Sequence, residues 1–105
     1  MADPMRIRAT VKDGKVDVRV LMSHEMETGQ RKDARGGLVP AWHIQTVTAV
    51  YAGRTVLSAQ WGPSVSKNPF LNFRFAGGKP GEKLSITWTD NRGDKRTDEA
   101  TITAG

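Results

Sequence analysis

The alternation of apolar and polar residues along this chain predicts an all-β fold, a seven-stranded antiparallel β-sandwich. Three observations support this class. Nearly every apolar stretch repeats with a period of two, and Gly, Asp, Asn and Pro separate these stretches at roughly even intervals. No stretch keeps a helical period long enough for a long helix. The length of 105 residues is that of one domain.

The first predicted hairpin spans residues 5–11 and 16–22, with Asp13 and Gly14 as a type I′ turn. This turn fixes the register of the apolar pairs on one face. The pairs are Ile7 with Val20, Ala9 with Val18 and Val11 with Val16. On the other face Arg8 falls opposite Arg19, and like charges repel there. We expect either the diagonal Asp17 or an acidic partner to relieve that repulsion.

The second predicted hairpin, residues 43–51 and 54–61, turns at Ala52 and Gly53. Two registers are compatible with its pattern. One buries Ile44, Val50, Leu57 and Trp61, and the other buries Val47, Ala49, Tyr51 and Val56. The pattern alone does not choose between them, so the inward face stays open.

Three further strands are predicted at residues 71–75, 84–89 and 95–103. Their apolar positions are Leu71, Phe73, Phe75, Leu84, Ile86, Trp88, Ala100 and Ile102. Seven short strands with regular turns are typical of an immunoglobulin-like sandwich. The two longer connections, residues 23–41 and 62–69, are where the chain can cross between sheets.

The connection at residues 23–41 follows no single period, and its glycines and Pro40 end any helix quickly. We predict one helical turn near Glu25 and a mobile tip at residues 31–37. The base of the connection is expected to be anchored by Met22, Met26, Leu38, Val39 and Trp42.

The stretch of residues 59–70 carries large apolar side chains but no strand period. Pro63 and Pro69 cannot donate a backbone hydrogen bond, so neither belongs in a central strand. Such a connection either closes the end of a core or contacts something else. We expect Trp61 and Phe70 to be core residues and residues 63–69 to form a contact surface.

No motif for catalysis or metal binding is complete. The absence of cysteine excludes disulfides, thiolate metal sites and cysteine nucleophiles. His24 and Glu25 begin a zinc-protease motif, but Thr28 stands where its second histidine is needed. His24 and His43, the two histidines, could form a mixed metal site with Glu25, Glu27 or Asp33, but two histidines without a cysteine are a weak signal for one. The sequence therefore predicts a non-enzyme without a cofactor or metal.

The charge balance favours acidic partners, with a net charge of +5 and a pI near 10.0. The best basic patch contains Arg6, Arg8 and Arg19, but other basic residues are spread along the chain. Nucleic-acid or polyanion binding is therefore an alternative rather than the main prediction. No apolar run can span a membrane, and the first residues lack the apolar segment of a signal peptide.

Three blocks, residues 21–33, 40–44 and 56–70, carry a resemblance to a known family, and residues 88–94 agree with it. Together they resemble the Z subunits of the Sox sulfur-oxidation carrier complex, SoxYZ. The resemblance implies an immunoglobulin-like sandwich bound to a Y subunit, whose cysteine carries sulfur intermediates of thiosulfate oxidation. It also implies a non-catalytic role in stabilising Y and presenting it to periplasmic Sox enzymes, with export alongside Y.

The candidate partner-binding residues lie in these blocks, where methionines and tryptophans near connections are typical of contact surfaces. They are Met22, His24, Glu25, Met26, Trp42, Trp61, Pro63, Val65, Ser66, Asn68, Pro69 and Phe70. The alternative for the same residues is that they close the ends of the sandwich.

Overall fold

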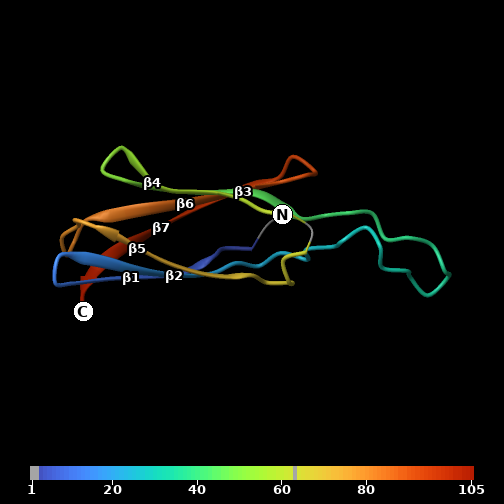
Figure 1. Ribbon diagram of the computed structural model, residues 1–105, viewed down its shortest axis with the longest axis horizontal. Coiled ribbons are helices and arrows are strands. Elements are labelled where there is room, and N and C mark those ends of the chain that lie inside the picture. Colours follow the sequence, from blue (N-terminus) through green and yellow to red (C-terminus); the bar gives the residue numbers. More distant parts are fainter. Residues whose placement is uncertain (1–2, 63) are drawn as a thin grey trace.

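Seven strands form the framework of the protein, as the alternation predicted (Figure 1). They are β1 (Arg6–Lys12), β2 (Lys15–Leu21), β3 (Ile44–Tyr51), β4 (Arg54–Gln60), β5 (Phe70–Ala76), β6 (Lys83–Asp90) and β7 (Lys95–Ala104). The computed structural model describes residues 3–62 and 64–105, so the prediction for Pro63 lies outside the described residues. Within the described ranges, no helix is long and apolar enough to cross a membrane.

The strands are hydrogen-bonded in the order β4-β3-β6-β7-β1-β2-β5 and fold into two facing layers. Strand β7 joins the layers, because residues 95–101 pair with β6 while residues 102–104 pair with β1. The β1–β7 pair is parallel, and the other pairs are antiparallel. The all-β sandwich is therefore confirmed, with one parallel pair that local periodicity cannot reveal. Strands β4 and β5 form the two edges.

The first hairpin has the predicted register. Its three apolar pairs and the opposed Arg8 and Arg19 are all observed. Asp13 and Gly14 adopt the positive φ angles of 54° and 76° that a type I′ turn requires. Asp17 forms an ion pair with Arg19 at 3.3 Å, as expected, whereas no ion pair between described residues includes Arg8, so the repulsion is relieved on one side only.

The second hairpin follows neither predicted register completely. Ile44, Val47, Ala49 and Tyr51 are all buried, although Ile44 belongs to the other alternating set. The pairing of β3 with β6 shifts between Ile44 and Thr46, which inserts one unpaired residue there. Such a bulge moves every earlier side chain of the strand to the opposite face. Residues from both predicted registers of β3 are therefore buried in the same core.

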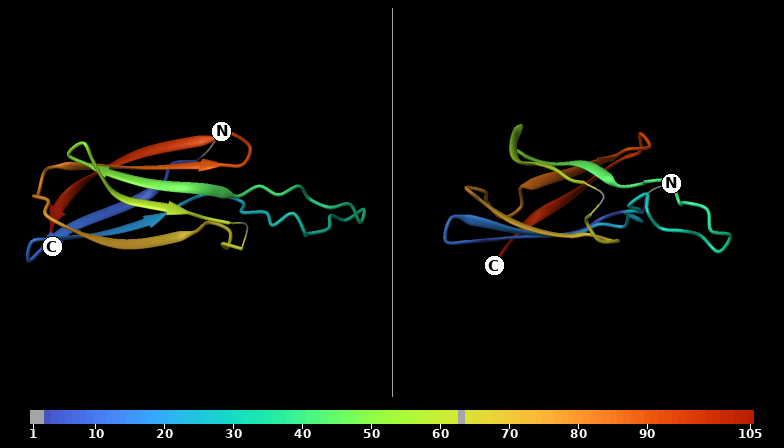
Figure 2. Two further views of the ribbon diagram at one scale, coloured as in Figure 1. Left: turned by 45° about the horizontal axis from the view of Figure 1, so that its top comes forward. Right: turned by 45° about the vertical axis from the view of Figure 1, so that its right-hand side comes forward.

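Residues 22–43, which we call the arm, project from the sandwich as an extended pair of segments (Figure 2). Bridges between Glu27 and Trp42 and between Lys32 and Leu38 hold the two segments together. The predicted helical turn near Glu25 is wrong, because the chain there is extended and Met26 has a φ of 52°. Leu38 was expected to anchor the arm, but 63% of it is exposed.

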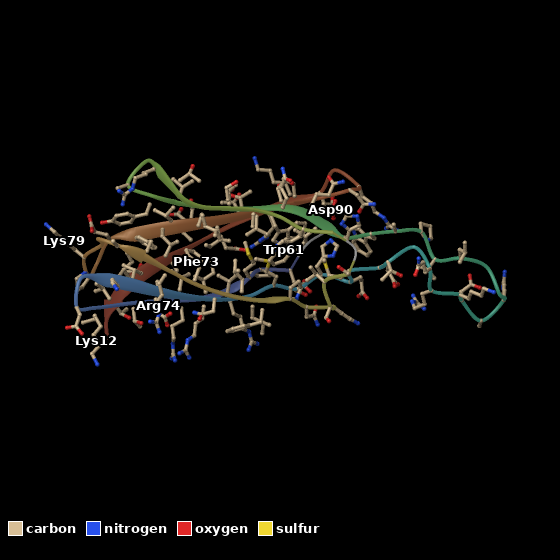
Figure 3. The ribbon with its side chains drawn as sticks, in the orientation of Figure 1. Lys12, Trp61, Phe73, Arg74, Lys79 and Asp90 are labelled. Carbon is tan, nitrogen blue, oxygen red and sulfur yellow. The ribbon has the colours of Figure 1, made fainter. Side chains whose placement is uncertain are left out.

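The core fills the space between the layers. It includes Val16, Val18 and Val20 from one layer and Leu84, Ile86 and Trp88 from the other. Trp61 and Phe73 point toward this space, whereas Lys12 and Arg74 lie on the outer side of the lower layer (Figure 3). The predicted alternation on β2 and β6 is thus confirmed.

Candidate partner-binding surface

The arm meets residues 61–62 and 64–69, which we call the crossing loop, at one end of the sandwich (Figure 2). Backbone hydrogen bonds continue the β2–β5 pairing beyond the strands. Met22 N donates to Pro69 O at 2.9 Å, and Asn68 N donates to His24 O at 2.9 Å. The side-chain oxygen of Asn68 accepts a further bond from His24 N at 3.1 Å. Two of the blocks that carry the family resemblance therefore form one local structure.

A buried polar cluster fixes the base of the arm to β6. His24 Nε2 lies 3.0 Å from Asp90 Oδ2, and Trp42 Nε1 donates to the same oxygen at 2.8 Å. His24 and Asp90 are only 6% and 4% exposed. The other oxygen of Asp90 accepts the backbone N–H groups of Arg92 and Asp94. This carboxylate is thus hydrogen-bonded on both oxygens, as a buried charge requires.

Both ring nitrogens of His24 are engaged. Met26 N donates to His24 Nδ1 at 3.0 Å, so Nδ1 accepts and the ring proton of the neutral form lies on Nε2, facing Asp90. A histidine that acts as a general base needs a free nitrogen near the group it deprotonates. Here both nitrogens are already hydrogen-bonded. The His24–Asp90 hydrogen bond instead holds the base of the arm against β6.

Hydrogen bonding determines the charge state of Asp90. Burial raises the pKa of Asp90, but the bonds from His24, Trp42 and the two backbone N–H groups outweigh it. The pKa of Asp90 consequently ends below its ordinary value, and the carboxylate is ionised near neutral pH.

Aromatic contacts complete the arm base. The ring of His24 lies 5.1 Å from both Trp42 and Trp88, edge-on to the latter, and the Arg92 guanidinium sits 4.3 Å from the Trp42 centroid. A cavity of about 210 Å³ opens beside these rings, lined also by Asp3, Ser23, Glu25, Asn68 and Asp94. No group of three or more His, Cys, Asp or Glu side chains within residues 3–62 and 64–105 could hold a metal ion.

The candidate residues divide into three groups by exposure. Met22, His24, Met26 and Pro69 are buried; Trp42, Trp61 and Val65 are half-buried; Glu25, Ser66, Asn68 and Phe70 are exposed. The buried side chains hold the arm and the crossing loop, and Trp61 and Val65 pack against the core. Direct partner contact by the exposed members stays a prediction.

Phe70 differs most from expectation. It was predicted as a core residue, but 63% of it is exposed because it occupies an outward position on β5. Leu21 lies directly opposite Phe70 on β2 and is 42% exposed. We call this pair the apolar corner. The sequence reasoning missed Leu21, although continuing the predicted β2 register past Val20 puts residue 21 on the outer face.

The sequence profile of the family described as "Sulphur oxidation protein SoxZ" matches residues 5–101 of this chain. The chain belongs to the SoxZ family. The match covers all three blocks that suggested the resemblance, and it assigns this SoxZ-family chain to sulfur oxidation. Among individually curated proteins, none matches the sequence.

Solved structures with a similar fold include superoxide reductases. The superoxide reductase (neelaredoxin) from Ignicoccus hospitalis is 16% identical with a TM-score of 0.60, covering 99% of this chain and 82% of that one. A variant of the superoxide reductase (neelaredoxin) from Archaeoglobus fulgidus, in its reduced form, is 18% identical with a TM-score of 0.59. The match covers 97% of this chain and 87% of that one. At these identities the likeness concerns the fold of the SoxZ-family chain alone.

Proposed function

We propose that this chain is the non-catalytic Z subunit of a sulfur carrier complex. It binds and stabilises a Y-type subunit, whose cysteine carries the sulfur intermediates of thiosulfate oxidation. It also helps present that cysteine to periplasmic Sox enzymes. In this proposal the subunit reaches the periplasm together with Y and needs no cofactor.

The composition supports the role of a subunit that accompanies the sulfur-carrying protein and does not itself carry the sulfur. Sulfur held covalently on a protein requires a thiolate, which is the nucleophilic form of cysteine. This chain has no cysteine, so a partner must supply one. The buried His24–Asp90 pair offers no free base, which supports assigning the chemistry to other proteins.

The apolar corner is the observation that carries the partner proposal. Leu21, Leu38 and Phe70 are the large apolar residues exposed among those described, and two of the three are cross-strand neighbours. Phe70 also begins the edge strand β5, next to the crossing loop. An aromatic and a leucine exposed together suit the centre of an interface, where a few apolar anchors supply most of the binding energy.

The polar residues near the corner suit the rim of such an interface. Lys67 pairs with Glu25 at 3.4 Å, with both side chains largely exposed. Ser66 and Asn68 are also exposed. We therefore centre the Y contact on Leu21 and Phe70, with these polar groups around them. A stable complex needs a total buried area of roughly 1,200 Å² or more.

Co-purification of the chain with its Y subunit at high salt tests the proposal directly. We expect Phe70→Ala to weaken the complex by more than about 2 kcal/mol, which is roughly a 30-fold rise in Kd. Leu38→Ala is the matched control, because Leu38 is as exposed as Phe70 but lies on the arm. Calorimetric titration gives both constants.

Two outcomes would contradict this assignment. Absence of any stable heterodimer argues against the carrier-subunit function itself. An intact complex that tolerates Phe70→Ala but loses affinity with Leu38→Ala moves the contact from the apolar corner to the arm.

A further inference from the structure

The outer face of β1, β2 and β5 is strongly basic. The observed register aligns the outward positions of these strands in rows across the three strands. The basic residues at these positions, which we call the basic face, are Arg6, Arg8, Lys12, Lys15, Arg19 and Arg74. All six are exposed, and Asp17 is the acidic residue among them. Figure 3 shows Lys12 and Arg74 on this side, turned away from the other layer.

The strand positions of this face carry a charge equal to the net charge of the chain. The chain has 16 basic and 11 acidic residues. The basic face contains six of the basic residues, and Asp17 is one of the acidic residues. Ten basic and ten acidic residues lie elsewhere in the chain. These seven strand residues therefore sum to +5, and Asp13 in the turn beside Lys12 lowers the charge of the surface to +4.

The charges on this face are poorly compensated within the chain. Asp17 is shared between Arg19 at 3.3 Å and Arg74 at 3.2 Å. No ion pair between described residues includes Arg6, Arg8, Lys12 or Lys15. Arg8 faces Arg19 and Lys12 faces Lys15 directly across the β1–β2 pair. Like charges so placed destabilise a sheet, and an anionic surface lying on them removes that cost.

We propose that the basic face docks an acidic protein surface, carried by the enzymes that act on Y-bound sulfur. This inference rests on the proposed carrier function. The basic rows lack an apolar centre, which suits a transient and salt-sensitive encounter better than a permanent subunit contact. Complementary charge accelerates such encounters and orients the partners. The permanent contact with Y then belongs to the apolar corner at the end of the same face.

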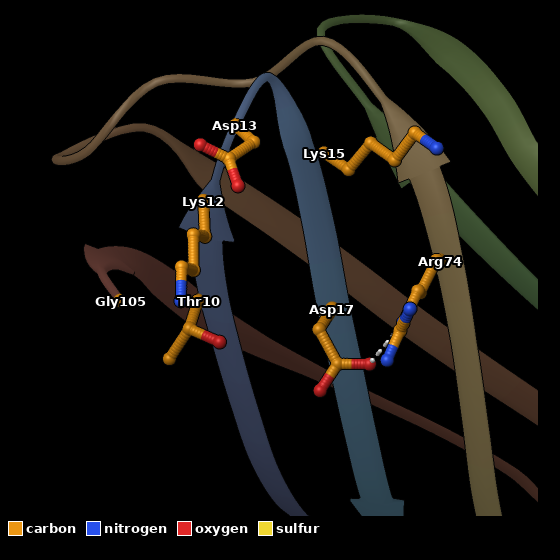
Figure 4. A pocket seen from close by; sticks show the side chains of 7 residues that line it. All are labelled: Thr10, Lys12, Asp13, Lys15, Asp17, Arg74 and Gly105. Carbon is orange, nitrogen blue, oxygen red and sulfur yellow. Dashed lines mark hydrogen bonds and ion pairs between the residues drawn. The ribbon is translucent and has the colours of Figure 1, made fainter.

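The details of the face favour an acidic protein over nucleic acid. Binders of single strands place aromatic side chains among the basic ones for base stacking, but the only aromatic on these outward positions is Phe70 at the corner. A hollow of about 490 Å³ at the turn end combines Lys12, Lys15 and Arg74 with Asp13 and Asp17 (Figure 4). The two carboxylates interrupt the row of cations, so the hollow does not form the continuous basic groove that follows a nucleic-acid backbone.

The test uses the assembled Y–Z complex, loaded with sulfur, as the substrate of purified Sox enzymes. The variant Arg8→Glu with Lys15→Glu reverses two unpaired charges of the basic face. The matched control, Lys83→Glu with Lys95→Glu, makes the same change at exposed positions of β6 and β7. We expect the face variant to lower kcat/KM about 10-fold or more at low salt, with kcat unchanged. The difference should largely vanish at high salt, where screening shortens the range of the interaction.

The affinity for Y and binding to random-sequence duplex DNA are measured on the same variants. Unchanged kcat/KM, or an equal loss in the control variant, overturns the docking face. A large loss of Y affinity also overturns it, because the face then belongs to the subunit contact. Face-dependent DNA binding at physiological salt with unaltered enzyme kinetics assigns the face to a polyanion instead. Failure of Y and Z to associate contradicts the carrier function, which separates that outcome from the others.

Discussion

His24 of the arm base follows Leu21 of the apolar corner by only three residues, but the two regions have opposite chemistry. At the arm base, His24 and Asp90 are buried polar groups, whereas at the corner Leu21 and Phe70 are exposed apolar groups. Each arrangement reverses the usual distribution of residue types. The hydrogen bonds of His24 and Asp90 explain why the arm base can be buried. No contact between described residues explains why the apolar corner is exposed. The difference indicates that the arm base maintains the fold and that the corner is available for a partner.

The largest expected effect comes from breaking the arm base. Asp90→Asn replaces one of the two acceptor oxygens with an NH₂ group and removes the charge. If the NH₂ group faces Trp42 Nε1 and His24, donors oppose donors; if it faces the backbone, the N–H groups of Arg92 and Asp94 lose their acceptor. We expect the free energy of unfolding to fall by about 3 kcal/mol. Chemical denaturation of the chain alone measures it.

Asp94→Asn is the control for this variant. Asp94 is exposed and lines the same cavity, so we expect its substitution to change stability by less than about 0.5 kcal/mol. An Asp90→Asn protein as stable as the wild type would show that the buried cluster does not hold the arm, and the contrast with the corner would fail.

The second prediction concerns Trp61, which lies at the opposite end of the crossing loop from Phe70. Trp61 is half-buried and packs against the core. We expect Trp61→Ala to reduce the free energy of unfolding by about 2 kcal/mol, less than for a fully buried tryptophan. Its affinity for Y should stay within about threefold of the wild type.

Thermal unfolding and calorimetric titration of the Trp61 variant separate stability from affinity. Phe70→Ala is its natural comparison, because the corner residue should show the reverse behaviour. A Trp61 variant of normal stability but weakened Y binding would extend the contact surface across the whole crossing loop.

Most of the fold was predictable because strand periodicity is local. The alternation on β2 and β6 specified the buried faces, and Asp13–Gly14 specified the first register. The bulge near Ile44 was not predictable, since the sequence has no glycine or proline there to mark it. The parallel β1–β7 pair joins opposite ends of the chain, so no turn between adjacent strands specifies it.

The candidate surface was predictable only in part. The sequence identified the correct segments, because the arm and the crossing loop do lie together. It could not separate Phe70 from Trp61, since both are aromatic residues at strand ends. The exposure of each side chain depends on whether the last position of its strand points toward the core or toward solvent. The pairing of β5 with β2 and of β4 with β3 determines that direction. The acceptor for His24 was also missed, because Asp90 lies 66 residues away in the chain.

The smallest expected effect is a pH dependence that also distinguishes the two regions. The folded-state pKa of Asp90 is lowered, so folding favours its ionised form. Its contribution to stability is complete above the unfolded pKa of about 4 and is lost as pH falls through the lowered folded value. The stability difference between wild type and Asp90→Asn should therefore shrink as the pH drops below about 4. The corner has no titrating group, so the effect of Phe70→Ala should not change over that range. Urea unfolding at a series of acidic pH values measures both differences, and a constant Asp90 difference down to the lowest pH would show that this carboxylate does not couple folding to protonation.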